Sequence, residues 1–146
     1  MRPWSTIVVG TDGSETAARA VGHAAELAAA TDATLVVVTA YQEGAHPGAA
    51  RAPEDVQWAL TASAGAEELA RAGAERAAGA GARSVRTRTL RGDPAAVLLQ
   101  VASDTDAGLI VVGSKGMTSA SRFVTGSVPN SLSHHADRDV LIVHTD

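Results

Sequence analysis

The sequence of 146 residues contains no cysteine, which excludes disulfide bonds, thiol catalysis and cysteine-ligated metal sites. Aromatic residues make up only 3% of the chain, so valine, leucine, isoleucine and alanine must build the core. No apolar run approaches the length of a membrane span, and no signal peptide precedes the first predicted strand. We therefore expect a cytoplasmic protein that does not enter a membrane.

Basic residues are outnumbered by acidic ones, 12 to 16, so the formal net charge is −4. This balance argues against binding nucleic acid or an anionic membrane through bulk charge. Lys115 is the single lysine among twelve basic residues, and it lies in a glycine-bearing segment. Apolar residues reach 45%, which fits one folded domain spanning residues 1–146.

Apolar segments alternate along the chain with helical patterns. The predicted strands are residues 6–9, 35–38, 85–90, 109–112 and 140–143. The predicted helices begin near Ser14, Pro53, Asp93 and Val128, and the second reaches about Ala78. This alternation predicts an α/β fold: a five-stranded parallel sheet, Rossmann-like, with helices on both faces. In the order 3-2-1-4-5, the loops after strands one and four would share one crevice, where such sheets bind ligands.

The strongest local motif follows the most apolar strand. It has the pattern Gly113-x2-Gly116-x9-Gly126-Ser127 and ends near a predicted helix start. Glycines let backbone N–H groups approach an anion, and Ser127 adds a hydroxyl, so the motif favours phosphate binding over a ligand-free turn. Neither the Walker A spacing nor the dinucleotide-binding fingerprint occurs here.

Five motifs, in order along essentially the whole chain, resemble the universal stress protein family. They are Val9-Gly10-Thr11-Asp12-Gly13-Ser14, Gly92-Asp93-Pro94, Val112-Gly113-Ser114-Lys115-Gly116, Gly126-Ser127-Val128 and Val140-Leu141-Ile142-Val143. The late glycine motif is the most specific of them. The resemblance implies a five-stranded parallel α/β sheet and a dimer formed through the last strand, residues 140–143.

The resemblance also implies roles for individual residues in an adenine-nucleotide site. The Asp12 side chain and the backbone near Ala40 would contact adenine, the 92–94 segment would lie near the ribose, and the glycine loop with Ser127 would hold phosphates. The complete set of candidate nucleotide-binding residues is Gly10, Thr11, Asp12, Ala40, Gly92, Asp93, Val112, Gly113, Ser114, Lys115, Gly116, Gly126, Ser127 and Val128.

The phosphate count of the ligand stays open at this stage. The surroundings of Pro129 resemble small actinobacterial members of the family, some of which bind cyclic AMP. Asp12 and Asp93 are candidate Mg²⁺ ligands if ATP is bound. We therefore predict a regulatory protein that binds ATP or cyclic AMP. The alternatives are a slow ATPase or nucleotidyl-transfer enzyme on the same fold, with Lys115 and Ser127 as its visible tools, and a ligand-free scaffold.

Overall fold

The structure, a computed structural model, describes residues 4–42, 62–114 and 127–144. The described elements are β1 (Thr6–Gly10), α1 (Glu15–Thr31), β2 (Thr34–Tyr41), α3 (Ala62–Gly79), β3 (Ser84–Arg91), α4 (Pro94–Thr105), β4 (Leu109–Gly113), α5 (Ser127–His135) and β5 (Asp139–Val143). Strands and helices alternate as the sequence predicts. The start of the predicted second helix at Pro53 and most of the preceding loop lie outside the described residues.

The five strands form one parallel sheet with the order β3-β2-β1-β4-β5. This confirms the predicted fold class and strand order. β1 occupies the centre, where Val9 lies opposite Val37 of β2 on one side and opposite Val111 of β4 on the other. Because β1 and β4 are neighbours and run in the same direction, the segments that follow them leave the sheet side by side.

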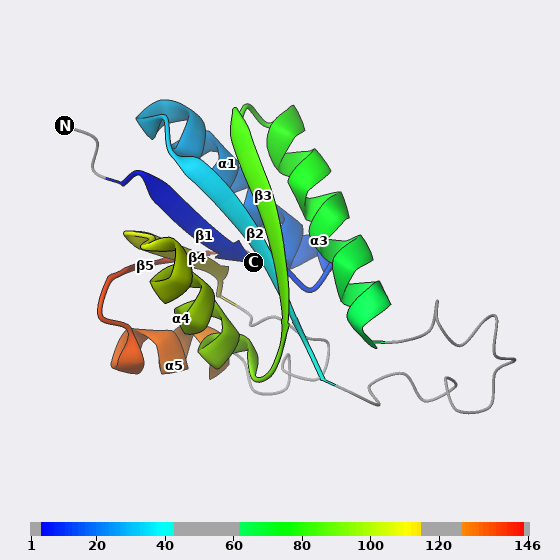
Figure 1. Cartoon of the computed structure of the whole chain (residues 1–146). Helices are drawn as coiled ribbons and strands as arrows, with labels where there is room; N and C mark the ends of the chain where they lie inside the picture. Colours follow the sequence, from blue (N-terminus) through cyan, green and yellow to red (C-terminus); the bar gives the residue numbers. More distant parts are fainter. Residues whose placement is uncertain (1–3, 43–61, 115–126, 145–146) are drawn as a thin grey trace, which may run out of the picture.

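Helices cover both faces of the sheet, α1 and α3 on one and α4 and α5 on the other (Figure 1). Successive residues of each strand point to opposite faces. In β1, Ile7 and Val9 pack toward α1 and α3, whereas Val8 packs toward α4 and α5. Both faces are apolar for this reason, which explains the unbroken runs of valine, isoleucine and leucine in the central strands.

Two predicted helix starts are confirmed by their hydrogen bonds. The Ser14 hydroxyl oxygen accepts a hydrogen bond of 3.2 Å from the backbone N–H of Ala17, so Ser14 caps α1. The carboxylate of Asp93 accepts one of 3.2 Å from the backbone N–H of Ala96, and Pro94 is the first residue of α4. Each cap satisfies an N–H group that the helix leaves without an internal partner.

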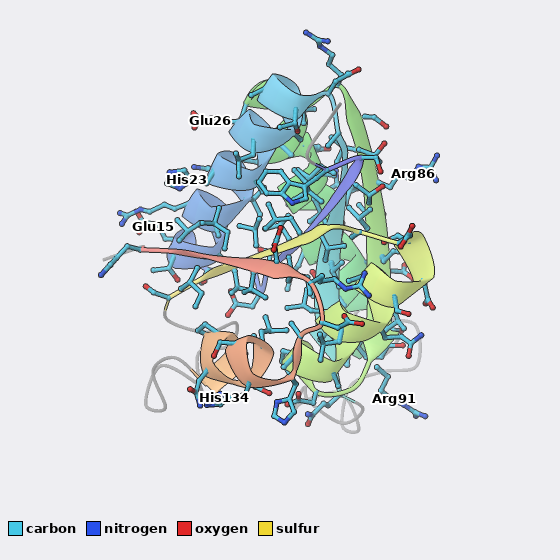
Figure 2. The ribbon with its side chains drawn as sticks, turned by 90° about the vertical axis from the view of Figure 1, so that its left-hand side faces the viewer. Glu15, His23, Glu26, Arg86, Arg91 and His134 are labelled. Atoms are coloured by element: carbon cyan, nitrogen blue, oxygen red, sulfur yellow. The ribbon has the colours of Figure 1, made fainter. Side chains whose placement is uncertain are left out.

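β3 is an edge strand, as its alternating valine, threonine and arginine residues predict. Val85 packs against the core formed with α1 and α3, and Arg86 is exposed. Figure 2 shows Arg86 directed away from the sheet. Arg88 is partly buried and lies 3.5 Å from an Asp104 carboxylate oxygen of α4. Charged residues of this kind make an edge strand a poor template for unwanted strand pairing.

Within the described ranges, no helix is long and apolar enough to cross a membrane.

Candidate functional site

The turn after β1 is fixed to β2 by backbone and side-chain hydrogen bonds. The Thr11 N–H donates to the carbonyl oxygen of Val38 at 2.9 Å. The Thr39 hydroxyl donates to the Thr11 carbonyl oxygen at 3.0 Å, and the Thr11 hydroxyl oxygen accepts from the Gly13 N–H at 3.1 Å. Thr11 and Thr39 are both buried. The backbone that carries the following residue, Asp12, is therefore held from two sides.

Asp12 lies partly buried in this turn. Its Oδ1 atom accepts a hydrogen bond of 2.9 Å from the backbone N–H of Ser14. Burial nevertheless raises the pKa of the Asp12 carboxyl above its ordinary value, because loss of solvent disfavours the charged form more than the hydrogen bonds with Ser14 favour it. Gly13 follows with a φ angle of +83°, a conformation that glycine adopts without strain. A desolvated carboxylate in a constrained turn is a candidate binding group.

The end of β4 lies beside this turn. Val112 and Gly113 are buried, and Gly113 pairs with Val143 of β5. The backbone N–H of Ser114 donates to the Val143 carbonyl oxygen at 2.8 Å, which extends the pairing by one residue. β1, which ends at Gly10 and is followed by Thr11 and Asp12, thus pairs with β4, which ends at Gly113 and is followed by Ser114. The predicted site residues Lys115, Gly116 and Gly126 lie outside the described residues.

The helix that follows the glycine motif is confirmed, although it begins at Ser127 rather than at Val128. Val128 is buried and packs into the core between α4 and the sheet. The first N–H groups of a helix have no intrahelical acceptor, and since Pro129 has no N–H, those of Ser127 and Val128 are the ones that the start of α5 can offer to an anion. His134 and His135 lie in the last turn of the same helix, at the end away from the glycine motif.

The remaining predicted residues lie at the carboxyl ends of the other two strands. Ala40 is near the end of β2, which pairs with β1 on the side opposite β4. Gly92 follows β3, where its N–H donates to the Tyr41 carbonyl oxygen at 2.9 Å and its φ angle is +144°. Asp93 comes next, as the cap of α4. All described candidates therefore lie along one edge of the sheet, but Gly92 and Asp93 are one strand further from β1 than Ala40 is.

A groove of about 430 Å³ lies between the end of β3 and α4. It is lined by Leu90, Arg91, Gly92, Ala96, Val97, Gln100 and Asp104. Gly92 is the one residue that this groove shares with the predicted set. The groove lies at β3, two strands from β1, and so does not coincide with the segments that follow β1 and β4.

The described residues contain no group of three or more histidine, aspartate and glutamate side chains that could hold a metal ion. Asp12 and Asp93 follow strands that are separated by β2. The chain's own side chains, so far as the structure describes them, do not form a preassembled metal centre. A Mg²⁺ ion that arrives with a nucleotide keeps several waters and phosphate oxygens as ligands, so it does not need such a centre.

Thr39 is a residue of this site that the sequence analysis did not identify. It follows the apolar residues of β2, where a threonine reads as an ordinary β-branched strand residue. Its hydroxyl contact with Thr11 depends on the pairing of β1 with β2. The available signal in the sequence was a polar residue directly after the apolar run of a strand expected to be buried.

A family model described as "Universal stress protein family" matches residues 3–144 of the chain. Universal stress protein Rv1636 of Mycobacterium tuberculosis is 40% identical over 146 residues, which cover 99% of each chain. A crystal structure of a universal stress protein in complex with cAMP is 38% identical, with a TM-score of 0.74 over 98% of both chains. A universal stress protein from Burkholderia pseudomallei is 30% identical, with a TM-score of 0.69 over 98% of both chains.

Proposed function

The chain belongs to the universal stress protein family, and we propose from that premise that it is a stress-response regulatory protein that binds ATP or cyclic AMP. The proposed site lies at the carboxyl ends of β1 and β4. One observation carries the proposal: β1 and β4 are adjacent parallel strands, so the Asp12 turn after β1 and the carboxyl end of β4 at Gly113 lie on the same side of the sheet. The complex of a 38% identical relative with cAMP supports an adenine nucleotide as the ligand.

Asp12 is the proposed adenine-recognition residue. A carboxylate offers two oxygen atoms with about four acceptor positions. The contact with the Ser14 N–H uses one of these, so acceptor capacity remains for the exocyclic amine of adenine. The backbone near Ala40 would present its own polar groups to the base from the adjoining strand, β2. Because Asp12 is partly buried, a hydrogen bond to it would be formed where water competes weakly.

The phosphate groups would be held on the other side of the crevice. Ser127 begins α5, whose first N–H groups are suited to an anion. Lys115, Gly116 and Gly126 complete the motif in the chain, and the sequence assigns them backbone contacts and one positive charge. The Gly92 and Asp93 segment would approach the ribose from β3. ATP would bring Mg²⁺, whereas cyclic AMP would need none.

A homodimer through β5 is also part of the proposal. β5 lies at the edge of the sheet, where it pairs with β4. Ile142, an apolar residue of this strand, is 44% exposed. Pairing two β5 strands would satisfy the edge and cover this side chain.

The test is to identify what the purified protein carries. Mass spectrometry of ligand released by denaturation should reveal an adenine nucleotide. If the protein is purified empty, ATP or cyclic AMP should raise its melting temperature, because a ligand that binds the folded state stabilises it. An empty protein whose melting temperature responds to neither nucleotide would contradict the proposal.

A further inference from the structure

Helix α3 packs directly on the turn that carries Asp12. Leu69 and Gly73 of α3 lie against it, and they are four positions apart and therefore on one face of the helix. Both are about sixty positions away in sequence from the turn that they touch. The contact is therefore a property of the fold and not of the local sequence.

Gly73 permits the close approach of the helix. A Cβ atom at this position would lie 2.9 Å from Val37 Cγ1 and 3.4 Å from Thr11 Cγ2. Glycine destabilises a helix interior relative to alanine, and at position 73 the close packing of the helix explains why a glycine is present. Gly65, in the same helix, has no atom within 4 Å of an added Cβ. The two glycines therefore differ in what surrounds them, while both weaken the helix.

Leu69 covers the turn from the side. A Cβ atom built on Gly13 would overlap Leu69 Cδ2, so the leucine side chain lies against the Gly13 backbone. Leu69 is 37% exposed, one of the few large apolar residues of the described chain that remain so. An apolar side chain at this place restricts the movement of the Gly13 backbone through van der Waals contact.

A third contact ties α3 to the helix that the turn begins. Arg76 Nε donates a hydrogen bond of 3.0 Å to the carbonyl oxygen of Ala18 in α1. α1 starts directly after Ser14, so α3 contacts both the turn and the first turns of the helix that follows it. Leu69, Gly73 and Arg76 thus lie on the face of α3 that packs against the turn and the start of α1.

We propose that Leu69 and Gly73 are positioning residues for nucleotide recognition. They hold the Thr11–Ser14 turn so that the Asp12 carboxylate meets the exocyclic amine of adenine. This inference rests on the proposed function and adds a determinant of base specificity that lies outside the nucleotide motifs. If α3 is displaced from the turn, the Asp12 carboxylate is positioned less precisely, and the protein discriminates less well between adenine and other bases.

The experiment compares Gly73→Ala with the matched control Gly65→Ala. Affinities are measured for ATP and ITP, and for cyclic AMP and cyclic IMP, since hypoxanthine carries a carbonyl oxygen where adenine carries the amine. The wild type should prefer the adenine form of each pair. Gly65→Ala should keep this preference, and Gly73→Ala should reduce it by about five- to tenfold. Equal preferences in the two variants would overturn the inference.

A second pair of variants covers the case in which Gly73→Ala does not fold. Leu69→Ala removes the cover over Gly13 and should reduce the preference for adenine, while Leu69→Met keeps an apolar side chain there and should restore it. Circular dichroism and thermal unfolding report the folded state of each variant. A wild-type preference in Leu69→Ala would count against the role of α3 while leaving the nucleotide site intact. If the wild type binds none of the four nucleotides, the proposed function itself fails.

Discussion

The hydroxyl group of Thr39, at the end of β2, donates a hydrogen bond of 3.0 Å to the backbone carbonyl oxygen of Thr11, in the turn after β1. Both residues are almost completely buried, at 2% and 3% exposure. This bond joins the two strands at the place where the candidate site begins. It leaves the Asp12 backbone little freedom before any ligand arrives.

Replacing Thr39 with valine should therefore destabilise the protein. The variant keeps the shape of the side chain but leaves the buried Thr11 carbonyl oxygen without that donor, at a cost of about 1–3 kcal/mol. Urea unfolding monitored by circular dichroism measures this loss. Thr39→Ser retains the hydroxyl and is the control, so it should lose less. Unchanged stability of Thr39→Val, which keeps the methyl group and lacks only the hydroxyl, would show that the hydrogen bond to Thr11 contributes little to stability.

The raised pKa of Asp12 predicts a dependence of stability on pH. The folded state holds the Asp12 proton more tightly than the unfolded state does, because burial disfavours the charge. The carboxyl therefore stabilises the fold least when ionised, and its contribution falls as the pH rises from the ordinary value of 3.8 through the raised pKa. Asp12→Asn should unfold at a higher temperature than wild type near neutral pH. The difference should vanish below pH 3.8.

The same variant should bind adenine nucleotides less well. Its amide oxygen can still accept from the Ser14 N–H, but the amide NH₂ group would then face the adenine amine, donor against donor. We expect a loss of about 1–3 kcal/mol in binding free energy, measured by calorimetry. A variant that gains stability and loses affinity would identify Asp12 as a residue kept for binding. Unchanged affinity would remove Asp12 from the site.

Dimerisation through β5 predicts that a charge on its exposed apolar residue disrupts the assembly. Ile142→Lys should shift the protein toward monomer in sedimentation velocity, since a buried unpaired charge is costly at an interface. Thr87→Lys is the control, because Thr87 is exposed on β3, at the opposite edge of the sheet. A native chain that sediments as a monomer at high concentration would rule out this interface.

The glycine motif supplies a further prediction, although Lys115 and Gly126 lie outside the described residues. Gly126→Val would add a side chain where the backbone must approach an anion, so it should abolish nucleotide binding while the sheet stays folded. Lys115→Ala should weaken ATP more than cyclic AMP, because ATP carries more negative charge within reach of the side chain. Titration of both nucleotides against both variants, with circular dichroism as the folding control, tests these expectations.

The arrangement of the sheet could be predicted from the sequence because its signals are local. Consecutive apolar residues marked the buried strands, and Ser14 and Asp93 marked helix starts that the hydrogen bonds confirm. The contacts behind the site could not be predicted in this way. A glycine in a helical pattern indicates only a locally weaker helix, whereas the structure shows that Gly73 lies against Val37 and Thr11. Such contacts join distant parts of the chain, and no local pattern encodes them.

Calorimetric titration of ATP and of cyclic AMP into the wild-type protein and into Asp12→Ala tests the central claim most directly. The account predicts saturable binding of at least one of these nucleotides, with one site per chain, to the wild type. It also predicts a loss of about 1–3 kcal/mol in binding free energy for Asp12→Ala, with the fold intact by circular dichroism. Absence of binding by the wild type, or equal affinities of the two proteins, would contradict a nucleotide site at the ends of β1 and β4.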